Sequence, residues 1–377
     1  NAGADGENVA VGYRAGEEVT EGIQNTLIGT QAGDALTHAD YNVAVGRNAL
    51  SSDTQGHKSV AIGVSALGSQ NFTSSTDTQN TAVGYNCGKS LTTGIRNTLV
   101  GHLCGEDLTD SDFNVAIGHG ALDADTKGNR SVAIGYNALS SQNFTTSTDS
   151  LNVAVGFGSQ IGTTTGTQNT SVGTNSLNAS SMTGTGNSVY GYEAANSITS
   201  GAYNTILGRY AADSLTTGAY NTNIGNDTDV SAADVQFAVA IGHSAVDKGT
   251  NTGFITPTSG VYQGNNNASW STTSDIRIKK NVTDNNIGLD TINKIQVKNF
   301  EYRTEDEIVD FDNPKSAVVK KEGVQLGVIA QEIQSILPDV VTEQSTGVLA
   351  VNPDNITWYL VNAVKELSAE IKKLKGE

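Results

Sequence analysis

A run of hydroxyl and basic side chains around residue 274 could break a peptide bond. Residues 271–282 read STTSDIRIKKNV. A serine hydroxyl is a weak nucleophile and needs a base beside it. Residues 274–377 contain no histidine, so the available base is a lysine whose pKa has been lowered by burial. Ser274 and Lys279 are five residues apart, and Ser274 taken alone would also fit the N-cap of a helix.

This run contains a longer motif, and a second motif and a helical stretch follow it. Residues 273–281 spell Thr-Ser-Asp-x-Arg-x-Lys-x-Asn, residues 327–334 spell Gly-x-Ile-Ala-Gln-Glu-x-Gln, and a helical stretch covers residues 355–375. Together they resemble the C-terminal intramolecular chaperone of phage tailspikes and tail fibres, the self-cleaving domain first recognised behind endosialidases. The resemblance covers residues 274–377. It departs at Val297, where relatives often have proline, and at Gln325, where some have histidine.

The resemblance implies roles for individual residues. Ser274 would attack the carbonyl of Thr273 while neutral Lys279 takes the hydroxyl proton, and Asp275 and Asn281 would orient the groups. The peptide bond between residues 273 and 274 would then break, by direct attack and hydrolysis of an ester or by an acyl shift. The reaction needs no cofactor.

Composition excludes several classes of protein. The chain has 377 residues, 42 of them glycine, and its net charge is −17 from 22 basic and 39 acidic side chains. It has no apolar run of about 18 residues, which excludes membrane insertion, and no basic excess, which argues against nucleic-acid binding. Residues 1–273 hold 37 of the glycines, with 9 basic and 22 acidic side chains, so two kinds of chain are joined near residue 270.

A phrase of five residues recurs through the first part: Asn or Ser, Val or Thr, a mostly apolar residue, Val or Ile, and Gly. Its spacing is 17 residues with few exceptions. Residues 8–79 and 80–151 align without gaps and are identical at 41 of 72 positions. A fixed period of this kind predicts a solenoid. The closing glycines are Gly12, Gly29, Gly46, Gly63, Gly84, Gly101, Gly118, Gly135, Gly156, Gly173, Gly191, Gly208, Gly225 and Gly242.

Each coil should be one short strand, ended by a tight bend at the glycine. The third residue after the glycine is small, and an aliphatic residue often follows at the fourth or seventh position, so both should point inward. We therefore expect a mostly β fold: a β-solenoid shaft of about fourteen 17-residue coils, followed by a small α+β chaperone domain that ends in a long helix.

Coils this small have a thin core, so self-association around a long axis is expected, most simply as a parallel homotrimer. Residues 8–245 resemble the head repeats of trimeric bacterial adhesins and the shafts of phage fibres. The last helix carries an a/d seam that is compatible with a trimer. The seam consists of Leu360, Val364, Leu367, Ile371 and Leu374.

Two features of the shaft are candidates for receptor binding. The residue after each glycine forms a column that includes Tyr85, His102, His119 and Tyr136, which would suit sugar or protein recognition or would be a plain stacking ladder. Two polar insertions of sequence Gln-Asn-Phe would present Phe72 and Phe144 at the tips of loops. No metal is expected at the histidines.

Two cysteines occupy the position of the small residue in consecutive coils. Cys87 and Cys104 are therefore expected to be small buried residues rather than a disulfide, because side chains stacked in register point the same way.

These inferences predict residues 1–245 as the shaft, 246–273 as a neck and 274–377 as a chaperone and autoprotease. The predicted function is a phage tail fibre that binds a host glycan or protein receptor. It would belong to the virion, assemble in the host cytoplasm, and contact other tail proteins through a region that precedes Asn1. A polysaccharide-degrading tailspike and a trimeric cell-surface adhesin are the alternatives.

Overall fold

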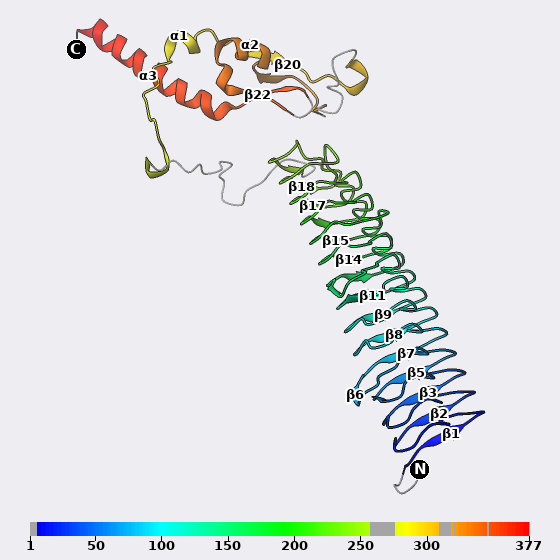
Figure 1. Cartoon of the computed structure of the whole chain (residues 1–377). Helices are drawn as coiled ribbons and strands as arrows, with labels where there is room; N and C mark the ends of the chain where they lie inside the picture. Colours follow the sequence, from blue (N-terminus) through cyan, green and yellow to red (C-terminus); the bar gives the residue numbers. More distant parts are fainter. Residues whose placement is uncertain (1–5, 257–275, 309–317, 320, 345–346, 377) are drawn as a thin grey trace. The chain divides into compact units, whose positions relative to one another are not determined.

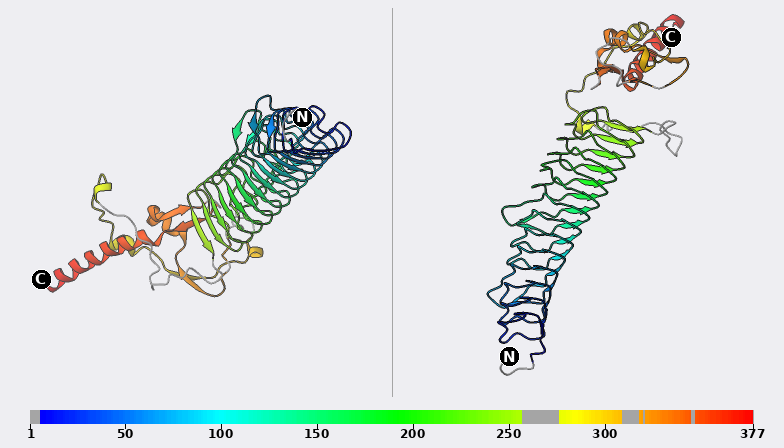
Figure 2. Two further views of the ribbon diagram at one scale, coloured as in Figure 1. Left: turned by 90° about the horizontal axis from the view of Figure 1, so that it is seen from below. Right: turned by 90° about the vertical axis from the view of Figure 1, so that its right-hand side faces the viewer.

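The computed structural model describes residues 6–256, 276–308, 318–319, 321–344 and 347–376. The chain divides into two compact units, Asn1–Val261 and Tyr262–Glu377. We describe each unit by itself (Figures 1 and 2). The predicted boundary at residue 273 and residues 257–273 of the predicted neck lie outside the described residues.

The first unit is a stack of coils, and each coil contributes one short strand to a single parallel sheet. Fifteen strands pair in chain order, residue for residue, along one side of the stack (Figure 1). They are β1 (Val9–Val11), β2 (Thr26–Ile28), β3 (Val43–Val45), β5 (Val60–Ile62), β7 (Thr81–Val83), β8 (Thr98–Val100), β9 (Val115–Ile117), β11 (Val132–Ile134), β13 (Val153–Val155), β14 (Thr170–Val172), β15 (Ser188–Tyr190), β16 (Thr205–Leu207), β17 (Thr222–Ile224), β18 (Val239–Gly242) and β19 (Gly253–Thr256).

The predicted solenoid is confirmed, with one coil more than expected. Strand β19 pairs in parallel with β18, although it begins only fourteen residues after Val239, with Gly253 opposite that valine. The sequence Gly-Phe-Ile-Thr has neither the asparagine nor the closing glycine of the repeated phrase, so the periodicity did not reveal it.

The interior of each coil is built from the positions that the sequence indicated. From β2 to β18 of this sheet the second residue of each strand is buried and its neighbours are less so, as in Val115–Ile117, whereas all three residues of β1 are exposed. After the first coil, where Ala15 and Val19 are partly buried, the small position is fully buried, as at Ala49 and Cys104, and so are aliphatic residues such as Leu50 and Leu91. These expectations are confirmed.

A column of buried asparagines joins each coil to the next. The Oδ1 atom of Asn97 accepts a hydrogen bond from the Asn114 backbone N–H at 3.0 Å, and its Nδ2 donates to the Ser111 carbonyl at 2.7 Å. An unmade hydrogen bond here would leave a backbone group buried without a partner. The same two bonds recur at Asn8, Asn25, Asn42, Asn80, Asn114, Asn152, Asn169, Asn187, Asn204 and Asn221.

The glycines that close the strands bring consecutive coils into backbone contact. Gly118 has φ +136°, and a Cβ placed on it would overlap the carbonyl group of Gly135 in the next coil. Glycine is therefore required both by the dihedral angle and by the absence of space.

The second unit consists of short helices, two antiparallel strand pairs and one long helix, against which two of the short helices pack. Its core consists of Ile333, Leu337, Val340 and Tyr359. The pairs are β20 with β21 and β22 with β23. The elements are η1 (Ile276–Ile278), α1 (Leu289–Ile292), β20 (Lys298–Phe300), η2 (Glu305–Glu307), β21 (Gln325–Gly327), α2 (Ala330–Ile336), η4 (Pro338–Val340), β22 (Val341–Glu343), β23 (Leu349–Val351) and α3 (Pro353–Lys375). Among the described residues no helix is long and apolar enough to cross a membrane.

Replacing Gly118 by alanine should destabilise the shaft by at least about 2 kcal/mol, because the new methyl group meets backbone at an unfavourable φ. The control is Gly253→Ala, where a Cβ meets nothing within 4 Å; it should change stability by less than about 0.5 kcal/mol. Urea unfolding followed by circular dichroism measures both. Equal effects of the two substitutions would contradict the assigned role of the turn glycine.

Candidate functional site

The column of residues after the turn glycines forms a continuous aromatic stack over five coils. The rings of Tyr85, His102, His119, Tyr136 and Phe157 are stacked with centroids 4.9 to 5.2 Å apart and planes within 17° of parallel. All five side chains are exposed. Because each ring covers the face of the next, the stack presents ring edges rather than ring faces to its surroundings.

The loops that carry Phe72 and Phe144 differ from the expectation. Both phenylalanines are buried, with 8% and 6% of their surface exposed, so they do not tip the loops. The backbone N–H of Phe72 donates to Oδ1 of the buried Asp53 at 3.0 Å, which turns the loop inward. The second loop repeats this at Asp125, with 3.1 Å to the Phe144 N–H.

The glutamine of each insertion bonds to the column at the point where a serine stands in place of an asparagine. Ser59 stands where an asparagine would be; Gln70 Nε2 donates to its Oγ at 3.0 Å and to Asp53 Oδ2 at 2.6 Å. Gln70 Oε1 in turn accepts from Asn80 Nδ2 at 2.8 Å. Gln142 makes the corresponding bonds in the second half of the duplication. The insertions therefore have a structural role: each supplies a glutamine that links the serine to the next asparagine of the column.

Burial raises the pKa of the Asp125 carboxyl group, while its hydrogen bonds from Gln142 and from backbone N–H groups oppose that shift. This carboxyl group lies inside the shaft, so it does not offer an acid for surface chemistry.

A serine, a histidine and an aspartate meet at the first insertion, but their hydrogen bonds exclude a catalytic triad. His57 Nε2 lies 2.8 Å from Ser75 Oγ, and its Nδ1 lies 3.6 Å from an Asp40 carboxylate oxygen. However, Nδ1 accepts the Asp40 backbone N–H at 2.9 Å, so the ring proton is on Nε2 and points at the serine. A general base needs the opposite tautomer. Asn129 makes the same two contacts in the second half of the duplication, which marks the arrangement as structural.

The two cysteines of the shaft are buried, and its described residues form no metal site. Cys87 and Cys104 are buried free thiols, as expected, and the pKa of Cys104 is raised by its contact with Cys87 and by burial. Among the described residues no group of three or more His, Cys, Asp or Glu side chains is arranged to hold a metal ion.

The expected cleavage site lies at the start of the second unit. Thr273, Ser274 and Asp275 lie outside the described residues. Lys279 follows η1, where its backbone N–H donates to the Ile276 carbonyl at 3.1 Å, and its side chain is exposed. The described residues of this unit therefore leave the Lys279 side chain exposed.

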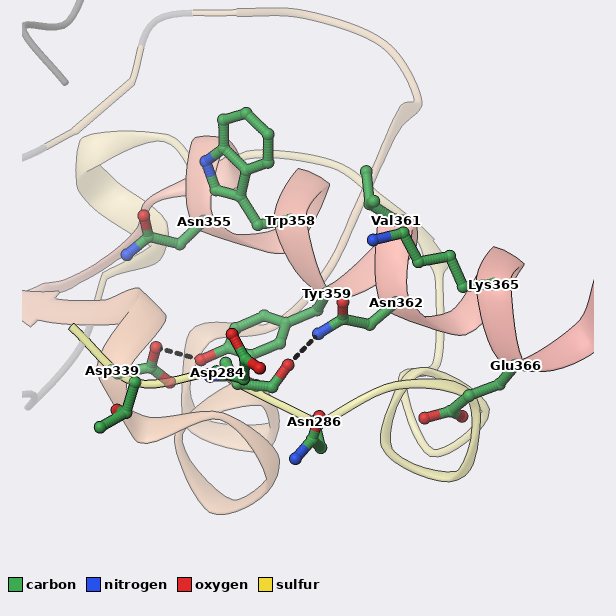
Figure 3. A pocket seen from close by; sticks show the side chains of 12 residues that line it. Asp284, Asn286, Asp339, Asn355, Trp358, Tyr359, Val361, Asn362, Lys365 and Glu366 are labelled. Carbon is green, nitrogen blue, oxygen red and sulfur yellow. Dashed lines mark hydrogen bonds between the residues drawn. The ribbon is translucent and has the colours of Figure 1, made fainter. Parts of the chain in front are cut away.

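The segment that follows Lys279 is held against the long helix α3. Asn362 Nδ2 donates to the carbonyls of Asn285 and Ile287 at 2.7 and 3.2 Å, and the Leu289 N–H donates to Glu366 at 2.7 Å. The contacts border a polar cleft of about 830 Å³ beside the exposed indole of Trp358 (Figure 3).

Tyr359 anchors α3 at the base of the same cleft. Its hydroxyl donates to Asp339 at 2.5 Å, and both groups line the cleft (Figure 3). The expected cleavage segment thus continues into residues that are fixed on the one long helix of the unit.

Comparison with protein families assigns this region. Residues 274–342 match the family model described as the chaperone of endosialidase. The resemblance inferred from the motifs is thereby confirmed, and the match begins at Ser274 itself. The family is a peptidase family, which implies autoproteolytic self-cleavage by this domain. Comparisons with curated proteins and with solved structures give no match.

The chaperone domain leaves the apolar stripe of α3 uncovered in the single chain. All five residues of the predicted seam are exposed, from 43% at Ile371 to 87% at Leu374. The buried residues of α3 are Tyr359 and Ala363, which face the domain itself. The described residues of this unit therefore leave the predicted seam exposed, while α3 packs on its own domain through Tyr359 and Ala363.

The Tyr359 hydroxyl should give the chaperone domain an alkaline limit of stability. Its hydrogen bond to Asp339 and burial raise the pKa of Tyr359 above its ordinary value of about 10. The bond therefore stabilises the fold below pH about 10, and this contribution is lost as the pH rises through the folded pKa. Tyr359→Phe should flatten this alkaline loss in urea unfolding followed by the helical circular-dichroism signal. Asp339→Asn should weaken it too, and an unchanged slope in Tyr359→Phe would contradict the assignment.

Proposed function

We propose that the protein is the subunit of a trimeric phage attachment fibre whose C-terminal domain assembles three chains and then cuts itself off between Thr273 and Ser274. The observation that carries this proposal is the chaperone-of-endosialidase match directly after a β-solenoid shaft. The fibre would join other tail proteins of the virion and would bind a host surface glycan or protein.

The surface of the shaft supports self-association. Apart from Val246, all exposed large apolar side chains of the described shaft lie on or beside the outer face of the parallel sheet. Those beside it are either the residue directly after a turn glycine or the residue five positions before one. One row on that face is apolar from end to end, with Ile28, Ile117 and Leu207 as examples. A patch of this length is larger than a single soluble chain normally exposes. Two further copies of the chain would cover it.

A chaperone is useful for such a shaft because its coils are nearly alike. Three chains that pair one coil out of register would still bury most of the same surface, so the register is weakly specified by the sheet alone. The exposed stripe of α3 provides a second contact of non-repeating sequence. Association through α3 would fix the alignment before the coils pair.

The proposed cleavage uses only groups of the chain and one water molecule. The Ser274 Oγ attacks the Thr273 carbonyl carbon, and the neutral amine of Lys279 accepts the hydroxyl proton and passes it to the departing Ser274 nitrogen. The C–N bond breaks and leaves an ester, which water hydrolyses to the Thr273 carboxylate and the free hydroxyl.

The exposure of Lys279 in the single chain bears on when this reaction occurs. A lysine amine becomes neutral near pH 7 only when it is desolvated. The described residues of the single chain leave Lys279 exposed, and in this proposal neighbouring chains bury it. Cleavage would then follow assembly, which makes the assembled fibre kinetically stable.

Incubation of the purified full chain tests the chemistry. The wild type should yield fragments of 273 and 104 residues, and Ser274→Ala and Lys279→Met should remain intact. Lys280→Met is the matched control, because it removes the adjacent positive charge, and it should cleave. Fragments from the Ser274→Ala chain, or none from the wild type, would contradict the dyad.

A charge placed on the α3 stripe tests assembly separately. Leu367→Glu should shift sedimentation from trimer towards monomer, because it buries a carboxylate in the seam. Ala369→Glu places the same charge on an exposed position off the seam and should leave the trimer unchanged. Identical sedimentation of both variants as trimers would exclude the stripe as the contact.

A further inference from the structure

The sheet face of the shaft is bordered by two columns of side chains, one on each flank. In every coil the residue after the turn glycine forms the first flank, and the residue five positions before that glycine forms the second flank. Over the fifth to ninth coils the first flank is the aromatic stack described above. The second flank over the same coils consists of Gln79, Arg96, Phe113, Arg130 and Leu151.

The second flank is also stacked along the shaft. Arg96 in the preceding coil and Arg130 in the following coil both place their guanidinium groups over the Phe113 ring, at 5.3 and 5.5 Å from its centroid. Arg96 Nε donates to Gln79 Oε1 at 3.0 Å, and Arg130 pairs with Asp149. Phe113 is 40% exposed and Leu151 44%. Since a guanidinium has five N–H donors, both arginines keep donors at their outer edge.

The two flanks present complementary edges coil by coil. The first flank offers hydroxyl oxygens and imidazole nitrogens, whose ring faces are already covered by stacking. The second flank offers N–H groups at Arg96 and Arg130. In the eighth coil the second flank has Arg130 and the first flank has Tyr136. In the ninth coil both flanks are apolar, with Leu151 on the second and Phe157 on the first. The third coil carries the same pairing with the roles exchanged, Tyr41 with Arg47.

We propose that the first flank of one chain packs against the second flank of its neighbour, coil for coil, and closes the outer seam of the fibre. The inference rests on the proposed trimer. In a ring of three identical parallel chains that meet through their sheet faces, each contact is heterologous, so one flank must meet the other. Rotation about the fibre axis adds no translation, so residues of the same coil lie at the same height.

This seam changes what the aromatic stack does. The rings of Tyr85, His102, His119 and Tyr136 form the boundary between two chains, and their polar edges serve the partner's arginines. The trimer therefore has three identical seams, and each chain contributes one flank to each of two of them. The stack also helps to fix the register that the apolar sheet face leaves open, because a shift by one coil would place Arg47 of one chain against Lys58 of another.

Site-specific photocrosslinking in the full chain tests the seam. The aromatic photoprobe p-benzoylphenylalanine replaces Tyr136 in one sample and Phe157 in a second, and each chain is mixed as 14N and 15N material before assembly. Irradiation should join residue 136 to residues 128–132 of another chain, and residue 157 to residues 149–153. The matched control places the same probe at the exposed Thr92 on another face of the coil, which should give no adduct between chains.

The outcomes separate this inference from the trimer itself, because each sample is also measured by sedimentation. A trimer whose probes give adducts only within their own chain, or adducts to a different coil of the neighbour, overturns the coil-for-coil seam and leaves the trimer standing. A monomer overturns both. If one probe prevents assembly, the other sample decides the question.

Discussion

The structure depends on the contact between one coil and the next. A coil of 17 residues encloses little more than an alanine and a leucine, so its own packing cannot stabilise it. Consecutive coils meet through turn glycines such as Gly118 and through buried asparagines such as Asn97, whose amide satisfies two backbone groups of the following coil. These contacts are directional and repeat at most coils, which explains why the sequence keeps both residue types.

The same dependence explains the irregular parts of the shaft. Where Ser59 and Ser131 interrupt the asparagine column, a four-residue insertion brings in Gln70 or Gln142, whose amide bonds to the serine hydroxyl and to the side chain of the next asparagine. The apolar interior also changes once, between a cluster that ends at Ala154 and one that begins at Leu177. Hydroxyl groups fill the interior there, with Ser159 Oγ 2.7 Å from Ser171 Oγ. The hydroxyl groups of Ser159, Ser171 and Ser176 are tolerated in the interior because they hydrogen-bond to one another.

Sequence periodicity was sufficient to predict the coils, their inward positions and the family of the last domain, because those features recur or carry local motifs. It failed where the same residue type could be either exposed at the tip of a loop or buried in the shaft. Phe72 and Phe144 look like loop tips in a polar insertion, and only the contacts with Asp53 and Asp125 show that they turn inward. The exposure of Lys279 and the pairing of β19 likewise follow from three-dimensional packing, which has no local signature in the sequence.

The central claim is that three chains assemble and then cut themselves at one bond. Native mass spectrometry of the purified protein tests it most directly, because it reports chain number and covalent length in one spectrum. The account predicts a particle built from three chains of residues 1–273, with or without the three 104-residue fragments still bound. A single intact chain of 377 residues would contradict it.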